Sequence, residues 1–192
     1  MLTTINPATG NVIKNYPIMS AEDINEIIDT TQKAHLLWRE VSLKERVQKL
    51  LTLKELLEHN KDNYASLITQ EMGKPIAAAK AEIEKCAWVC QHYAENGPMY
   101  LQPKLVETDM QKSYVAYEAL GIILAIMPWN FPFWQVFRFA IPNLLLGNAI
   151  LLKHAPISTG TALAIEALLH SAGLQSNILS TLLVDVDAVD DG

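Results

Sequence analysis

The sequence predicts an α/β fold in which N-terminal helices precede half of a doubly wound parallel sheet. Two observations lead to this fold class. Apolar residues recur at helical spacing through the first half of the chain. Beyond it, three apolar segments at 121–127, 148–153 and 177–184 alternate with two amphipathic helical segments. Strand, helix, strand, helix, strand is one βαβαβ unit, half of a doubly wound, Rossmann-like sheet.

The composition narrows the class of protein. Half of the 192 residues are hydrophobic and 19% are charged, which is typical of a folded chain with a sizeable core. The net charge of −6 gives no electrostatic reason to expect nucleic acid. The longest apolar runs fall short of the ~20 residues that a membrane helix needs, and the N-terminus lacks the regions of a signal peptide. We therefore expect a cytoplasmic protein with no nucleic-acid or membrane partner.

The first two helices are expected from their caps. Ser20 precedes an apolar stripe at helical spacing, formed by Ile24, Ile27, Ile28, Ala34 and Trp38. The segment "SLKE" at 42–45 has the form of a capping box, in which the Ser42 hydroxyl bonds the Glu45 amide and the Glu45 carboxylate reaches back. Helices are therefore predicted to begin just after Ser20 and just after Ser42.

The next two helices are separated by "EMGKP" at 71–75. Asn60 or Asp62 can cap the third helix, and Gly73 suits the left-handed conformation just past its end. Pro75 suits the first position of the fourth helix. The fourth helix is expected to end near residues 96–98, where "NGP" has turn chemistry.

Two cysteines, Cys86 and Cys90, lie one turn apart in the fourth helix. A zinc site would need two more ligands, and only His92 is near in the sequence. Free cysteines otherwise behave as small hydrophobic residues. We expect two buried, reduced thiols and no metal.

The character of the chain changes after residue 100. The segment "VETDMQKSYVAYEAL" at 106–120 predicts two short strands around a polar turn, and "GIILAIM" at 121–127 predicts a strand buried on both faces. A helix at 132–146 is expected to begin through Pro132. A helix within 158–173 is expected to have Ser158 as its N-cap and Gly173 just past its end.

Polar side chains follow the first two parallel strands. Asn130 lies in "IMPWNFPFWQVFR" at 126–138 after the first strand, and Lys153 ends the second. Ligands of doubly wound sheets bind beyond the carboxyl ends of the strands. An amide there can stabilise an oxyanion, and a lysine can bind a nucleotide ribose or phosphate. The residues alone leave open a rigid structural corner at Asn130 and a solvated lysine at 153. The chain contains no G-x-G-x-x-G, P-loop, G-x-S-x-G or H-E-x-x-H motif.

Four motifs together resemble the aldehyde dehydrogenase superfamily. They are "INPATG" near the start, "EMGKP" at 71–75, "GIILAIMPWNFPFWQ" at 121–135 and "GNAILLKHAP" at 147–156, in the order and spacing of that family. The resemblance extends from residue 5 to about residue 184. Among the branches, the chain looks most like bacterial NAD(P)-dependent succinate-semialdehyde dehydrogenases.

The resemblance implies oxidation of an aldehyde to an acid with NAD or NADP. It assigns Asn130 to the oxyanion hole, Arg138 to the substrate carboxylate and Trp134 to the substrate pocket. It assigns cofactor contacts to Ile126, Met127, Pro128, Trp129, Lys153, Ala155 and Pro156. Many NAD-preferring members carry K-P-S-E where this chain reads K-H-A-P. The choice between NAD and NADP is therefore open, and we interpret His154 as a local variant rather than a ligand.

The resemblance also implies a division of the chain. Residues 1–100 would be the helical N-terminal part of the cofactor-binding domain, 101–118 the β-hairpin of the oligomerisation element, and 119–192 the first βαβαβ half of the cofactor-binding domain. Members of the family are much longer, homo-oligomeric in their full-length form, and carry the nucleophilic cysteine and catalytic glutamate in the part absent here. The chain is therefore expected to be an inactive N-terminal fragment. The alternatives are a non-catalytic fragment that pairs with itself or a homologue, and an unrelated helical nucleotide-binding module.

Overall fold

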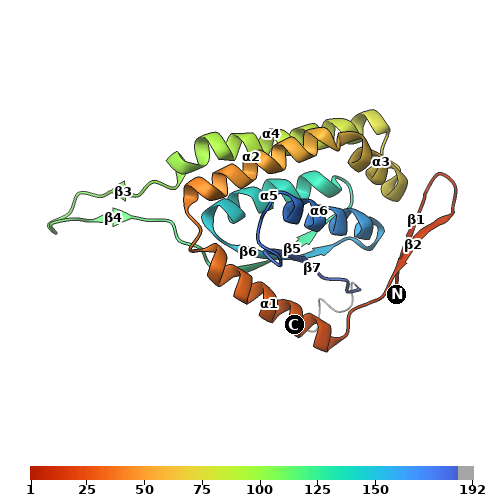
Figure 1. The fold of residues 1–192 in the computed structure, drawn as a ribbon, viewed down its shortest axis with the longest axis horizontal. Helices are drawn as coiled ribbons and strands as arrows, with labels where there is room; N and C mark the ends of the chain where they lie inside the picture. The colour runs from red at the N-terminus through yellow and green to blue at the C-terminus, as the bar shows by residue number, and fades with distance from the viewer. Residues whose placement is uncertain (186–192) are drawn as a thin grey trace.

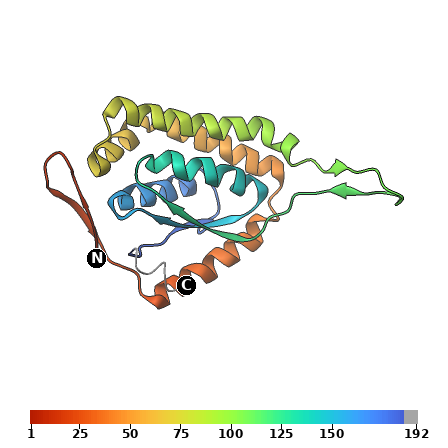
Figure 2. The same cartoon turned by 180° about the vertical axis from the view of Figure 1, so that it is seen from behind.

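The computed structural model describes residues 1–185 and has a three-stranded parallel sheet with helices on both faces (Figure 1). Helix α1 lies on one face, and α5 and α6 lie on the other. Helices α2, α3 and α4 form a further layer outside α5 and α6 (Figures 1 and 2). The helices are α1 (Ala21–Trp38), α2 (Leu43–His59), α3 (Lys61–Met72), α4 (Ile76–Tyr100), α5 (Pro132–Leu146) and α6 (Thr159–Ser171), with a 3₁₀ turn at Pro156–Ser158.

The sheet confirms the predicted βαβαβ unit. Its strands β5 (Ile122–Met127), β6 (Ala149–His154) and β7 (Leu179–Thr181) are parallel and lie in the order β5-β6-β7. Strand β6 is central and buried along its whole length. Strands β5 and β6 pair from Ile122 with Ala149 to Met127 with His154, so their carboxyl ends coincide. The loops that follow these two strands therefore begin side by side.

The prediction that residues 121–127 are buried on both faces was wrong. Ala125 is buried, but its neighbours Leu124 and Ile126 are 53% and 55% exposed. Successive residues of a strand point to opposite faces, so only one face of β5 is covered by the described residues. An apolar sequence makes burial of both faces of a strand possible. Whether both faces are buried depends on which elements pack against the strand.

The predicted helix starts were largely confirmed. Ser20 forms a full capping box with Asp23, since the Asp23 carboxylate also accepts from the Ser20 backbone N–H. At the second helix, the Ser42 hydroxyl accepts from the Glu45 N–H, as predicted. The Glu45 carboxylate does not reach back and instead lies 3.8 Å from the Lys49 ammonium. The competing ion pair along the helix explains this difference.

Helix α4 is longer than predicted. Gly73 ends α3 in the left-handed conformation, as expected, and Pro75 is the residue just before α4 rather than its first. Helix α4 then continues past Pro98 to Tyr100, so the predicted end at 96–98 was wrong. Pro98 lies in the last turn of α4, so the N–H bond that it removes and the bend that it favours affect only the end of the helix. A Cβ at Gly97 would collide with Leu145 of α5. The "NGP" sequence therefore permits a close helix crossing rather than a turn.

The end of α5 fixes where β6 begins. Gly147 has a φ of 112°, which favours glycine, and its N–H caps the carbonyls of Asn143 and Leu144. The Gly147 carbonyl lies 3.2 Å from Nδ1 of His35 on α1. The contact links α1 on one face of the sheet to the end of α5 on the other face. It lies immediately before the central strand β6.

The start of α6 is capped differently from the prediction. Ser158 occupies the N-cap position, but its hydroxyl makes no capping bond. The carboxylate of Glu71 on α3 instead accepts from the N–H groups of Gly160 and Thr161 and from the Thr161 hydroxyl, each at 2.8 Å. Burial raises the pKa of Glu71, and these three bonds oppose the rise. Gly173 lies just past the end of α6, as expected.

Two hairpins extend from this body. The predicted hairpin is present as β3 (Lys104–Leu105) and β4 (Tyr114–Val115), which are antiparallel and project away from the helices (Figures 1 and 2). A first hairpin of β1 (Leu2–Ile5) and β2 (Val12–Tyr16) was not predicted. Its signal is a polar "NPATGN" turn between two short runs rich in threonine, isoleucine and valine.

The cysteines are buried, as expected. Cys86 and Cys90 are both free and have no exposed surface. Among residues 1–185, no group of three histidine, cysteine or acidic side chains is placed to hold a metal ion. No helix within the same residues is both long and apolar enough to cross a bilayer.

Candidate functional site

The candidate site lies where the loops after β5 and β6 meet. The aligned ends of these strands place Ile126 beside Lys153 and Met127 beside His154. Past the strand ends, the Ala155 N–H donates to the Met127 carbonyl at 3.0 Å. The structure thus brings the "IMPWNF" corner and the "KHAP" segment together, as the sequence predicted for the carboxyl edge of the sheet.

His154 fastens these two loops to each other. Its Nδ1 accepts from the Ala155 N–H at 2.8 Å, so Nε2 carries the ring proton and donates to the Pro132 carbonyl at 3.0 Å. Burial lowers the pKa of His154, and the neighbouring charge of Lys153 lowers it further. The side chain is 5% exposed. These contacts make His154 a structural tie, in agreement with its interpretation as a local variant.

Glu82 of α4 holds the other side of the corner. One of its carboxylate oxygens accepts from the N–H groups of Phe133 and Trp134 at 2.9 and 3.0 Å, the first N–H groups of α5. A carboxylate is favourable at a helix N-terminus because of the free N–H groups and the helix dipole. The other oxygen pairs with the buried ammonium of Lys74. That ammonium also lies 3.8 Å from the centroid of the Phe131 ring.

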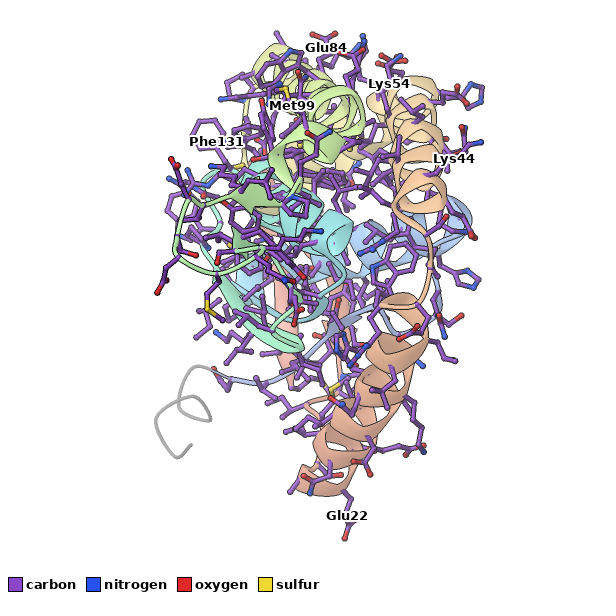
Figure 3. All side chains as sticks on the ribbon, turned by 90° about the vertical axis from the view of Figure 1, so that its left-hand side faces the viewer. Glu22, Lys44, Lys54, Glu84, Met99 and Phe131 are labelled. Carbon is purple, nitrogen blue, oxygen red and sulfur yellow. The ribbon has the colours of Figure 1, made fainter. Side chains whose placement is uncertain are left out.

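The corner between these attachments presents its side chains to solvent. Pro128, Trp129, Asn130 and Phe131 are all exposed. Figure 3 shows Phe131 at the side of the molecule opposite Lys44 of α2. Within the described residues, the Asn130 amide has no hydrogen-bond partner, so its two N–H groups are available to a ligand. The corner is thus fastened at both ends, and the amide between them is unpaired.

Lys153 is buried at the end of β6, with 6% of its surface exposed. The alternative of a solvated lysine therefore does not fit. Among residues 1–184, no carboxylate lies within ion-pair distance of its ammonium. A buried cation without an acid is suited to an anionic or polyhydroxyl ligand. Ala155 and Pro156, which follow it, are half-buried.

Trp134 and Arg138 lie on successive turns of α5. Trp134 is half-buried, and the ammonium of Lys85 on α4 lies 4.0 Å from the centroid of its ring. Arg138 is exposed. Residues four apart on a helix share a face, so Trp134 and Arg138 lie on the same side of α5. Both follow Asn130 along one edge of the structure.

Sequence reasoning missed the side chains that hold the corner in place, Glu82 and Lys74. A signal for Glu82 was present, because it lies among the buried positions Ala79, Ile83 and Cys86 of α4. An acid on an apolar helix face indicates a buried partner. The partner itself, the start of α5, is distant in the sequence and was not predictable.

The chain is similar to aldehyde dehydrogenases along its length. The aldehyde dehydrogenase family model matches residues 1–191. The chain is 44% identical over 183 residues to a probable succinate-semialdehyde dehydrogenase [NADP(+)] of Synechocystis sp., covering 95% of this chain and 40% of that protein. It is 43% identical over 186 residues to the succinate semialdehyde dehydrogenase [NAD(P)+] Sad of Escherichia coli, covering 97% of this chain and 40% of that one. The chain thus spans about 40% of the length of these curated relatives.

Solved structures are also similar to this chain over nearly its whole length. A succinic semialdehyde dehydrogenase from Streptococcus pyogenes, in complex with NADP+, superposes with a TM-score of 0.94 at 31% identity, covering 100% of this chain and 42% of that one. A succinate-semialdehyde dehydrogenase from Burkholderia pseudomallei gives 0.90 at 33% identity, covering 97% and 39%. The likeness includes the helices, the hairpins and the βαβαβ unit.

Replacing Glu82 by glutamine tests its role in holding the corner. The change leaves the buried ammonium of Lys74 without a charged partner, so the free energy of unfolding is expected to fall by about 3 kcal/mol. Urea unfolding followed by circular dichroism measures the loss. Glu84→Gln on the same helix is the control, because Glu84 is exposed and pairs with Lys61 at the surface (Figure 3). Equal losses in the two variants would contradict the role of Glu82.

The tie at His154 predicts a dependence of stability on pH. Its pKa is lowered in the folded chain, so the unfolded chain binds more protons as the pH falls below about 6.5, the ordinary histidine value. Stability is therefore full above that pH and is lost as the pH falls through the folded-state pKa. Urea unfolding at pH 7, 6 and 5 should show a steeper loss in the wild type than in His154→Gln. Parallel curves for the two proteins would refute the prediction.

Proposed function

The chain belongs to the aldehyde dehydrogenase family, and from this premise we propose that it is part of an NAD(P)-dependent enzyme that oxidises succinate semialdehyde to succinate. The observation that carries the proposal is the fastened corner at the carboxyl edge of the sheet. There the loop that carries Asn130 begins beside the strand end that carries the buried Lys153, and neither side chain has a partner among residues 1–184. The names of the Synechocystis and Escherichia coli relatives support the substrate and the cofactor.

In the proposed reaction, Asn130 stabilises the oxyanion that forms when a nucleophile adds to the aldehyde carbon. Its amide N–H groups donate to that oxygen without adding a charge to the site. Such a donor contributes about 3–4 kcal/mol to the transition state when it is held in place beforehand. The bond from Ala155 to the Met127 carbonyl before Asn130, and the bonds of His154 and Glu82 to residues 132–134 after it, provide that fixed geometry.

Lys153 fits the ribose of a nicotinamide nucleotide, which supplies the hydride acceptor when bound. A buried ammonium at a strand end, with no carboxylate of residues 1–184 within ion-pair distance, can donate to the ribose hydroxyls or to a phosphate on them. Pro156 brings no negative charge to this edge, so a 2′-phosphate would not be repelled. Ile126, Met127, Pro128 and Trp129 would form the apolar wall beside the nucleotide.

The nucleophile of the proposed reaction does not come from Cys86 or Cys90. Both thiols are fully buried, and burial raises the pKa of each above its ordinary value. A buried neutral thiol is neither accessible nor nucleophilic. We therefore propose that the nucleophile belongs to the region of the enzyme that the relatives have beyond this match, and that these 192 residues alone do not turn over.

We further propose that the three segments keep the roles that the sequence suggested. Residues 1–100 and 119–192 would belong to cofactor binding, and 101–118 to oligomerisation. In the enzyme, Arg138 and Trp134 would receive the end of the substrate remote from the aldehyde. A guanidinium matches the geometry of a carboxylate, which suits a semialdehyde that carries one.

A second candidate function is a non-catalytic fragment that pairs with itself or with a homologue. The observation that favours it is the projecting β3–β4 hairpin, whose Leu105 and Met110 are 78% and 70% exposed. Exposed apolar side chains on a projecting strand pair are suited to a partner. An unrelated nucleotide-binding module is excluded by the family match.

Activity can be tested in a chimera in which this chain replaces the matching region of the Escherichia coli relative. The chimera is expected to form NAD(P)H from succinate semialdehyde, and the isolated chain is not. Asn130→Ala should lower kcat about 100-fold to 1000-fold because it removes an oxyanion donor. Asn11→Ala, in the first hairpin, is the control and should retain wild-type kcat. A folded chimera without activity would contradict the proposed enzyme.

The pairing function makes a different prediction. If the hairpin mediates association, the isolated chain should elute above the mass of a monomer on a sizing column. Met110→Lys within the hairpin should then shift it toward the monomer by placing a charge on the apolar surface. Lys44→Glu on α2 is the control for a change of charge elsewhere (Figure 3). A monomer at every protein concentration would rule this function out.

A further inference from the structure

The ammonium of Lys85 lies against the candidate substrate residue Trp134, 4.0 Å from its ring centroid. This placement follows from the contact one turn earlier. Glu82 binds the N–H groups of Phe133 and Trp134, which fixes α4 against the first turn of α5. Lys85 is three residues after Glu82 and therefore lies on the same side of α4. Its position over the indole is thus set by a buried contact rather than by chance at the surface.

Lys85 is also a cation without a paired acid among residues 1–184. The neighbouring charges of α4 are paired, Lys80 with Asp62 and Glu84 with Lys61. Within the same residues, no carboxylate lies within ion-pair distance of Lys85 or of Arg138. Two such cations on adjacent helices, one over the Trp134 indole and the other one helical turn beyond Trp134, create a local positive potential that attracts an anion.

The direction of α5 brings the guanidinium of Arg138 toward the ammonium of Lys85. Helical side chains tilt toward the N-terminus of their helix, so Arg138 extends back toward the turn that carries Trp134. Four residues of helix span about 6 Å, comparable to the length of a four-carbon chain. Asn130 lies just before the start of α5, and Trp134 lies in its first turn. A substrate with its oxygen at Asn130 would place its far end beside Trp134, Lys85 and Arg138.

We propose that Lys85 is a second specificity residue, which receives the substrate carboxylate together with Arg138 while Trp134 provides the wall for the methylene carbons. This inference rests on the proposed function and specifies its substrate class as aldehydes with a terminal carboxylate. A lysine held against an aromatic face loses less freedom on binding than a free surface lysine. Two cations from two helices also discriminate against neutral aldehydes more strongly than Arg138 alone.

The test compares succinate semialdehyde with butanal, which has the same number of carbons and no carboxylate. In the chimera described above, Lys85→Met removes the charge and keeps the length of the side chain. KM for succinate semialdehyde is expected to rise about 5-fold to 10-fold, with kcat and all constants for butanal unchanged. Lys85→Arg should restore KM to within about twofold. Lys44→Met, on the side of the molecule opposite Phe131 (Figure 3), should match the wild type.

Three outcomes separate this inference from the proposed function. If the wild-type chimera shows no preference for succinate semialdehyde over butanal, the proposed function fails. If the preference is present, is reduced by Arg138→Met and is unchanged by Lys85→Met, the function stands and the role of Lys85 is overturned. An equal rise in KM for both substrates in Lys85→Met would also overturn it, because Lys85 would then only pack Trp134. Matching melting temperatures establish that the variants are folded.

Discussion

The buried carboxylate of Glu82 joins three regions of the molecule at one side chain. It accepts from the first N–H groups of α5, lies within α4, and pairs with Lys74, whose ammonium covers Phe131. Asn130 and Trp134 lie on either side of this junction, so their positions relative to α4 depend on it. A buried charge is tolerated only when hydrogen bonds and a counter-ion satisfy it. Glu82 meets this condition, and the site geometry follows from it.

Glu71 has the same role at the start of α6. It caps α6 from α3, as Glu82 caps α5 from α4. The two helices that follow β5 and β6 therefore each begin on an acid from the outer helical layer. The helix starts adjoin the edge of the sheet where the proposed cofactor lies, so this layer determines the shape of the site although it lies outside the βαβαβ unit. His154 adds the direct tie between the two loops.

Sequence patterns predicted those features that depend on residues close together in the chain, such as helix starts and ends. The bounds of α5 follow from Pro132, which needs no N–H partner at a helix start, and from Gly147 just past its end. The capping acids could not be predicted, because Glu82 and Phe133 are 51 residues apart and only packing joins them. The exposed face of β5 and the continuation of α4 past Pro98 have the same explanation: both depend on which elements lie nearby. Asn130 and Lys153 were predicted as candidates because the loops after parallel strands have a fixed place in the fold. The other candidates came from the family resemblance, and all of them stay predictions.

The β3–β4 hairpin has a consequence for how such proteins diversify. Its strands of two residues pair with each other and with no other strand among residues 1–185, and its side chains are largely exposed. The core that supports Asn130 and Lys153 therefore does not rely on it. Substitutions or insertions there can accumulate without disturbing this core. The hairpin is a separable module of the fold, which can change in sequence and in length while the sheet and its covering helices stay the same.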